Sequence, residues 1–328
     1  MAALWPLIGV PAPTGALANA TAPEPSATVP AESGTLRALT YNIAGLPEIL
    51  SSAETDRQTS TTAIGAGLNS YDLVNVQEDF NYHAALYSAA VHPYRTPTSG
   101  GAGIGSGLNT LSTYPLEGPE RVTWERCWIG TGDCLTPKGF TFTRVRPADG
   151  VVIDVYNLHT DAGSEPNDLT ARAANLDQLT RFIAARSSGN AVIVMGDTNS
   201  RYTRAGDEIA EFVAANNLRD PWVDLVRNGD VPVKGAPALS CAETNPTDDC
   251  EIVDKVLYRS GDRVSLEAIG YRNDHSRFAT DDGTPLSDHF PIAVDLDWSC
   301  AGDCVDDIED PLRSDGVGSV DRGGSLGR

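Results

Sequence analysis

The sequence lacks long apolar runs: none of its 328 residues belongs to a stretch that approaches the ~18 apolar residues of a membrane-spanning helix. We therefore expect no segment that crosses a bilayer. Hydrophobic content of 41% and charged content of 21% are typical of a soluble globular chain, and the length suits one large domain.

Positive charge is also scarce, with 24 lysines and arginines against 45 acidic residues and a net charge of −21. Because Lys and Arg contacts with phosphate supply most non-specific affinity for nucleic acid, this balance argues against a broad nucleic-acid-binding surface. It leaves room for an enzyme that holds phosphate through a metal ion and a few local cations.

The N-terminal segment lacks the positive charge of an export signal, since the first cation is Arg37, but Ala18-Asn19-Ala20 resembles a signal-peptidase site. The following residues are rich in Ala, Pro, Ser, Thr and Glu, as linkers are. We predict a signal-peptide remnant and linker over residues 1–34, a folded domain over 35–298, and an acidic, Gly/Ser-rich disordered tail over 299–328.

Six cysteines fall into three couples that are close in sequence. No Cys-x₂-Cys motif is present and no histidine lies within five residues of a couple, which argues against zinc and favours disulfides. By proximity, among the 15 possible connectivities, the predicted pairs are Cys127–Cys134, Cys241–Cys250 and Cys300–Cys304. Disulfides belong to oxidising compartments, so we expect a secreted, extracellular protein.

Hydrophobic periodicity predicts alternating strands and helices, the pattern of an α/β fold. The predicted helices cover residues 55–68, 82–90, 168–186 and 207–216. The clearest is 168–186, with Asp168 as its predicted cap. The predicted strands cover residues 36–42, 72–77, 120–127, 140–146, 151–158, 191–195, 252–258, 264–269 and 291–298.

Polar side chains stand where predicted strands end or begin, and these are the places where such scaffolds present functional groups. The residues are Asn42, Glu78, His159, Asp197, Asn199, Asp254, Asp288 and His289. Each of these residues taken alone could be an ordinary surface residue, but the presence of so many polar residues at strand ends indicates a functional site. Carboxylates, amides and histidines together suggest metal-assisted attack of water on a phosphoester.

Glu78 is the best candidate for a metal ligand, with Asn42 beside it, because Mg²⁺ prefers hard oxygen ligands; Mn²⁺ or Ca²⁺ would fit the same residues. Asp197 and Asn199 are candidates for orienting the attacking water and the phosphate.

The two histidines have different candidate roles. His289 is a candidate base or proton shuttle, with a nearby carboxylate to fix its tautomer. His159 is a candidate donor to a phosphoryl oxygen. Asp161, just after it, is expected in a solvated loop.

Six short motifs in order resemble the endonuclease/exonuclease/phosphatase superfamily, which has the fold of deoxyribonuclease I. They are Thr40-Tyr-Asn42, Val76-Gln-Glu78, Leu158-His-Thr160, Gly196-Asp-Thr-Asn199, Val253-Asp-Lys-Val256 and Ser287-Asp-His289. The resemblance implies a single-domain, four-layer α/β/β/α sandwich. It also implies that Asn42 supports Glu78 at the metal, that Asp197 and Asn199 lie at the reacting phosphate, and that Asp254 pairs with His289.

A second resemblance covers about forty residues from Cys127 onward. Cys134-Leu-Thr-Pro-Lys-Gly-Phe140 is similar to the segment before the histidine strand in bacterial neutral sphingomyelinase C. It implies a phosphodiesterase for phospholipid headgroups, with Lys138 near the phosphate; a solvent-facing loop lysine is the alternative. Residues 271–280 lack the paired aromatic tip of membrane-active members, so we expect at most peripheral membrane contact. We also expect the protein to be a monomer.

Other functions remain open at this stage. A secreted nuclease of the deoxyribonuclease I type would use Arg201 and Arg204, after the Asp197 loop, to hold a nucleic-acid backbone. A phosphomonoesterase acting on a soluble small molecule would use the same metal site. A catalytically silent binding module is disfavoured because every expected catalytic position is filled.

Overall fold

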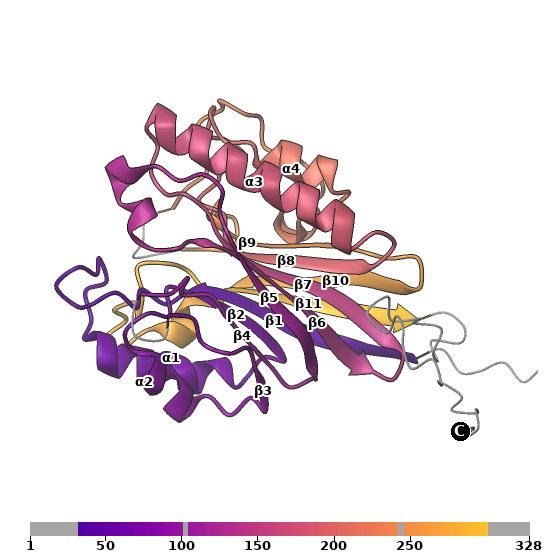
Figure 1. Ribbon diagram of the computed structural model, residues 1–328, viewed down its shortest axis with the longest axis horizontal. Coiled ribbons are helices and arrows are strands. Elements are labelled where there is room, and N and C mark those ends of the chain that lie inside the picture. The colour runs from indigo at the N-terminus through magenta and orange to yellow at the C-terminus, as the bar shows by residue number, and fades with distance from the viewer. Residues whose placement is uncertain (1–31, 101–103, 242–245, 301–328) are drawn as a thin grey trace, which may run out of the picture.

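Two β-sheets lie face to face in the computed structural model, which describes residues 32–100, 104–241 and 246–300 (Figure 1). The six strands of sheet A have the order β10-β11-β1-β2-β4-β3, and the five strands of sheet B have the order β5-β6-β7-β8-β9. Sheet A comprises β1 (Glu32–Asn42), β2 (Leu73–Gln77), β3 (Tyr94–Arg95), β4 (Asn109–Ser112), β10 (Val264–Asn273) and β11 (Ile292–Cys300). Sheet B comprises β5 (Leu116–Thr123), β6 (Gly139–Ala148), β7 (Val151–His159), β8 (Ala191–Asp197) and β9 (Asp254–Arg259).

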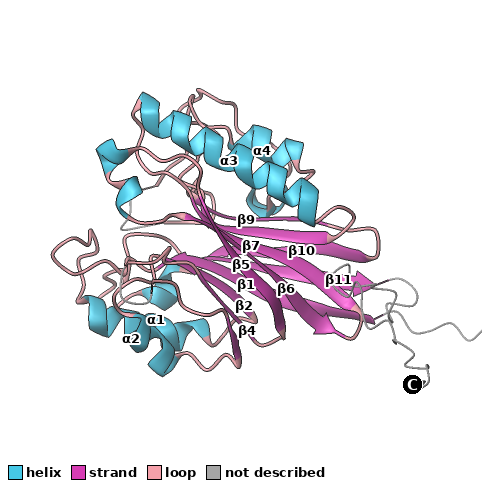
Figure 2. Cartoon of the chain, viewed as in Figure 1, coloured by secondary structure: helices cyan, strands magenta, loops and turns pink. Residues whose placement is uncertain are grey.

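Helices cover the outer face of each sheet (Figure 2). On sheet A lie α1 (Arg57–Leu68) and α2 (His83–Ala89), and on sheet B lie α3 (Pro166–Arg186) and α4 (Ile209–Ala215). Short 3₁₀ turns occur at Ile129–Thr131, Asp133–Leu135 and His275–Phe278, and a π-helical turn occurs at Trp222–Val226. The predicted four-layer α/β/β/α sandwich is therefore confirmed as a single domain.

Helix α3 follows the expected amphipathic pattern, because Leu176, Leu179 and Ile183 are buried against sheet B. Its start differs from the prediction by two residues. Glu165 is the N-cap, and Asp168 is its partner in a capping box, where each side chain accepts the other residue's backbone N–H.

The layer between the sheets changes character along its length. Toward one end it is aliphatic and aromatic, with Ile193 and Val256 of sheet B packed among Leu296 and Trp298 of sheet A. Toward the strand ends that hold the polar residues, side-chain amides bridge the two sheets. Asn157 Nδ2 donates to the carbonyls of Val76 and Asn109, each at 3.0 Å.

Removing one bridging amide is expected to destabilise the whole sandwich. Asn157→Ala removes the hydrogen bonds to the buried Val76 and Asn109 carbonyls and to the Gln77 amide, which donates to Asn157 Oδ1 at 2.8 Å and retains its bond to Thr40 Oγ1 at 3.1 Å. Each such loss costs about 1–3 kcal/mol, so we expect a fall of about 3 kcal/mol in the free energy of unfolding. Urea denaturation measures it, and the exposed Asn81→Ala is the matched control. Equal stability of the two variants would refute a bridging role.

Two of the three predicted disulfides are present, Cys127–Cys134 and Cys241–Cys250. Cys300 is also disulfide-bonded, but its predicted partner Cys304 lies outside the described residues. Most of the predicted linker and tail lie outside them too, although β1 and β11 extend slightly beyond the predicted bounds 35 and 298. Within the described ranges, no helix combines the length and the apolar character needed to cross a bilayer.

Candidate active site

The polar residues predicted at strand ends meet at one end of the sandwich, and both sheets contribute. Asn42 ends β1 and Glu78 follows β2 in sheet A, while His159 and Asp197 end the adjacent parallel strands β7 and β8 in sheet B. Asp254 begins β9 directly opposite Asp197 in the antiparallel register. The site therefore depends on how the two sheets are packed.

Glu78 has a strained backbone, with φ of +57°, a conformation uncommon for a residue other than glycine. The chain passes very close to it, since a Cβ at Gly45 would lie 2.2 Å from the Glu78 carbonyl oxygen. Strain of this kind persists where surrounding structure enforces it and is concentrated at functional sites. The backbone here turns the carboxylate toward the end of β1.

Asn42 links the glutamate to sheet B. Its Nδ2 donates to Glu78 Oε1 and to Asp197 Oδ2, both at 3.2 Å, while its Oδ1 accepts the backbone N–H of Ala44 at 3.1 Å. In this arrangement Asn42 acts as a hydrogen-bond donor and orients the carboxylates of Glu78 and Asp197. Direct metal ligation through Oδ1 would require the amide to turn over.

The surroundings of Glu78 fit a divalent cation. Burial raises the pKa of its carboxyl group, and within the described ranges no Lys, Arg or His lies within ion-pair distance of it. A half-buried carboxylate that no cation contacts directly is stabilised when a metal ion compensates its charge. Glu78 would hold the ion, and Asn42 would support it.

His289 lies between two carboxylates. Its Nδ1 is 2.9 Å from Asp254 Oδ2, and its Nε2 is 3.7 Å from Asp197 Oδ2. Burial alone would lower the pKa of His289, but Asp254 and then Asp197 outweigh it and raise that pKa well above its usual value. The predicted Asp254–His289 contact is therefore present.

These three side chains also present ligand atoms that lie within 4.8 Å of one another, a second arrangement able to hold a metal ion. The raised pKa of His289 favours an imidazolium whose own charge balances Asp197 and Asp254. A protonated imidazole has no lone pair for a metal, so Glu78 is the better position for the ion.

His159 is 2% exposed and faces Asp197, with 3.2 Å between its Nε2 and Asp197 Oδ2. Burial, followed by the charge of Lys138, lowers the pKa of His159 to about 3, so its ring is neutral and donates to the carboxylate. Burial would raise the pKa of Asp197, but His289, His159 and Lys138 outweigh it and lower that pKa to about 2.

The two remaining predicted residues lie at the rim. Asn199 has φ of +45°, and its backbone N–H donates to Asp197 Oδ1 at 2.9 Å. Asp288 is exposed, next to Ser287, whose hydroxyl donates to the Asn42 carbonyl at 2.7 Å. The structure thus brings together seven of the eight strand-end residues, with Asp288 at the edge.

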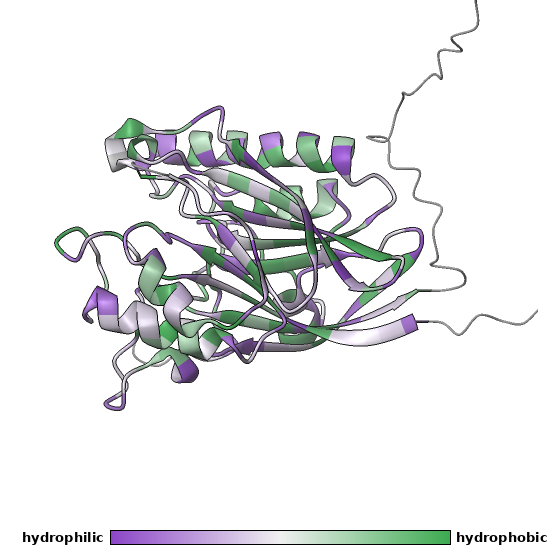
Figure 3. Cartoon of the chain, turned by 60° about the horizontal axis from the view of Figure 1, so that its bottom comes forward, coloured by the Kyte–Doolittle hydropathy of each residue, from purple (hydrophilic) through white to green (hydrophobic). Residues whose placement is uncertain are grey.

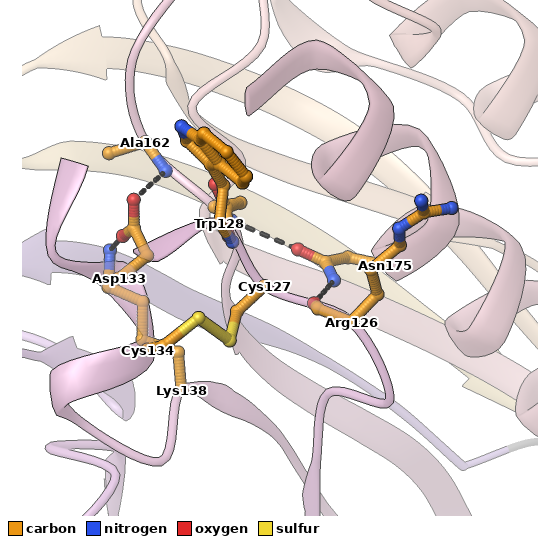
Figure 4. Close-up of a disulfide and its surroundings, with 9 residues drawn as sticks. Arg126, Cys127, Trp128, Asp133, Cys134, Lys138, Ala162 and Asn175 are labelled. Atoms are coloured by element: carbon orange, nitrogen blue, oxygen red, sulfur yellow. Dashed lines mark hydrogen bonds and ion pairs between the residues drawn. A yellow bond between two sulfur atoms is a disulfide. The ribbon is translucent and has the colours of Figure 1, made fainter. Parts of the chain in front are cut away.

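Lys138 is not a solvent-facing lysine, because its side chain is only 11% exposed. Its ammonium pairs with the buried Asp133 (Figure 4). It also lies 3.4 Å from the Thr160 carbonyl oxygen. Asp133 also accepts the backbone N–H of Ala162 at 3.1 Å. The sequence prediction missed Asp133, although its position beside Cys134 was a signal.

Asp161 is a correction: it was expected in solvent but is 1% exposed. It accepts the backbone N–H of Trp128 at 2.8 Å and so ties the Cys127–Cys134 loop to the chain after His159. Burial raises its pKa to about 6.

The fold and the residues at these strand ends can be compared with those of known protein families. Residues 41–238 match the model of Endonuclease/Exonuclease/phosphatase family 2, and the chain belongs to this family. The predicted resemblance to the superfamily is thereby confirmed.

Some individual relatives have names that are more specific than that of the family. The chain is 42% identical over 269 residues to proteins called sphingomyelinase in Mycobacterium bovis and Mycobacterium tuberculosis. The match covers 80% of this chain and 52% of those proteins, so the chain spans about half the length of the curated relatives it matches.

Solved structures share the fold. Sphingomyelinase C from Streptomyces griseocarneus has a TM-score of 0.55 at 20% identity, covering 82% of this chain and 100% of its own. A beta toxin variant from Staphylococcus aureus with bound magnesium ions has a TM-score of 0.56 at 16% identity, covering 80% and 99%. The predicted nearness to sphingomyelinase C is confirmed.

Proposed function

We propose that this chain is a secreted, Mg²⁺-dependent phosphodiesterase of the sphingomyelinase C type, which releases the phosphorylated headgroup of a phospholipid. The observation that carries the proposal is that Glu78, Asp197 and His289 lie together where the two sheets meet. The buried cation of Lys138 lies next to them. The 42% identity to mycobacterial sphingomyelinases supports the lipid substrate.

A divalent cation bound at Glu78 would polarise the phosphoryl group and favour ionisation of water. Asp197 and Asn199 position the water and a phosphoryl oxygen, since both lie at the point where sheet B meets Asn42. Lys138 offsets the negative charge that develops on phosphorus-bound oxygens, and Asp133 holds its side chain in place.

His289 is the proton-exchanging group. Asp254 binds its Nδ1–H and leaves Nε2 directed toward Asp197. The oxygen of water bonds to phosphorus and the water proton leaves to solvent, while the bond from phosphorus to the lipid alcohol breaks. The imidazolium of His289 donates a proton from Nε2 to the leaving alkoxide and is then reprotonated from solvent. His159, buried behind Asp197, acts by orienting that carboxylate rather than by touching phosphate.

For Arg204, one of the two arginines of the nuclease alternative, the geometry gives little support. Arg204 donates to the Asn199 carbonyl at 2.9 Å and pairs with Asp207 at 3.1 Å, so its guanidinium is engaged within the protein. It is therefore not a free cation for a nucleic-acid backbone.

A substrate panel tests the proposal. With Mg²⁺, purified protein is expected to hydrolyse sphingomyelin, and EDTA should lower the rate on the order of 100-fold or more because the electrophile is removed. Phosphocholine release measures it, and excess Mg²⁺ added after EDTA is the control. Cleavage of plasmid DNA or of soluble phosphomonoesters without lipid turnover would contradict the substrate assignment, and activity that survives EDTA would contradict the metal.

A further inference from the structure

Two loops next to the site carry exposed aliphatic side chains. The first, residues 44–56, follows β1 and holds Ile49 and Leu50, which are 92% and 66% exposed. The second, residues 124–138, precedes β6 and holds Ile129 and Leu135, which are 58% and 73% exposed. Single exposed aliphatics are common on protein surfaces, but pairs on two neighbouring loops indicate an interaction surface.

Both loops are tied to the strand ends that form the site. The Asn81 backbone donates to the Gly45 carbonyl at 3.0 Å, which holds the first loop beside Glu78. In the second loop, Asp133 accepts the Ala162 backbone N–H, three residues after His159. Figures 1 and 3 show both loops projecting from the same end of the sandwich, with apolar segments in each.

The second loop is braced with its apolar side chains outward. The Cys127–Cys134 disulfide closes it (Figure 4). The Trp128 backbone N–H donates to the buried Asp161. A loop held in this way keeps its aliphatic side chains exposed instead of folding them onto the domain.

The charge of the first loop favours one kind of lipid surface over another. The first loop has three exposed acids, Glu48, Glu54 and Asp56, and no lysine or arginine, and the whole chain has a net charge of −21. An anionic lipid surface would repel it. A phosphocholine surface presents trimethylammonium groups outermost, which complement the acids, above acyl chains that accept aliphatic side chains.

We propose that Ile49, Leu50, Ile129 and Leu135 form a membrane-contact surface on which the enzyme docks to a zwitterionic phosphocholine bilayer, with the site mouth facing the lipid headgroups. The surface replaces the aromatic tip that residues 271–280 lack. The choice of lipid rests on the proposed phosphodiesterase function, whereas the docking surface rests on the two loops.

Three double variants of the full chain test the surface. Two change one loop each, Ile49→Ser with Leu50→Ser and Ile129→Ser with Leu135→Ser. The matched control, Val91→Ser with Ile269→Ser, removes exposed aliphatics (73% and 53%) elsewhere on the molecule. Binding is measured by sedimentation with sphingomyelin–phosphatidylcholine vesicles in EDTA, which stops turnover. Each loop variant is expected to bind ~10-fold more weakly than the wild type, and the control to bind equally.

Further measurements distinguish failure of the membrane-contact surface from failure of the proposed function. We expect unchanged melting temperatures, unchanged hydrolysis of soluble p-nitrophenylphosphocholine with Mg²⁺, and weaker binding of the wild type to phosphatidylglycerol vesicles. Loop variants that bind like the wild type, or a wild-type protein that does not bind vesicles, would overturn the surface even if the soluble diester is cleaved. A shift from dimer to monomer in the loop variants would assign it instead to a second copy. Loop-dependent binding without hydrolysis of any diester would support the surface and refute the proposed function.

Discussion

Glu78→Gln is expected to lower the turnover of phosphodiester by about 10³-fold or more while leaving the fold intact. Glutamine keeps the volume of the side chain and an oxygen that can accept from Asn42, but it removes the charge that would hold the cation. Because burial raises the pKa of Glu78, the ionised form is unfavourable in the metal-free protein, and the variant should melt at the same temperature or higher.

Isothermal titration with Mg²⁺ is the second measurement for this variant. The wild type is expected to bind the ion and Glu78→Gln to bind it much more weakly. Glu267→Gln, on the exposed face of β10, is the matched control and should change neither quantity. Retained turnover together with retained Mg²⁺ binding would show that the metal is held elsewhere, with Asp197, Asp254 and His289 as the next candidates.

His289→Asn is the second substitution with a large expected effect, a loss of turnover of about 10³-fold or more. Asparagine can still donate to Asp254, but it cannot exchange a proton near neutral pH and it leaves Asp197 and Asp254 without their shared cation. His275→Asn, in the 3₁₀ turn before β11, is the control and should retain activity.

The same pair of variants gives a pH-dependent stability test. The pKa of folded His289 is raised, so its contribution to stability is fully present below the unfolded pKa of ~6.5 and is lost as pH rises through the folded pKa. Urea unfolding should therefore show the largest difference between wild type and His289→Asn at pH 6 or below, and a smaller one in alkaline solution. A difference that grows with pH would mean that His289 is neutral in the folded protein.

Most of the fold was predictable because apolar strands and amphipathic helices carry strong local patterns. The prediction was least accurate at the edge of sheet B, where residues 120–127 were expected as a strand and β5 occupies Leu116–Thr123. Within the part of the chain that the structure describes, this strand pairs with β6 alone, and it has an irregularity between Glu117 and Glu120, next to Pro119. An edge strand with a bulge has little burial to set its hydrophobic pattern.

The members of the site were predictable, but their contacts were not. Strand ends identified Asn42, Glu78 and Asp197, since strand position follows from local sequence. That Asn42 donates to both carboxylates depends on how sheet A packs on sheet B, which no local pattern encodes. Burial of Lys138 likewise depends on Asp133, whose role appears only once the disulfide loop has folded.

The pairing of β1 with β11 places Glu32 opposite Cys300, at the far end of the strand from Asn42. With eleven residues in β1, roughly 30 Å separates the two ends of that strand. The domain can thus be tethered to other modules at both chain ends without obstructing substrate entry. The same adjacency makes this chain a good candidate for circular permutation, with a short linker joining residues 300 and 32.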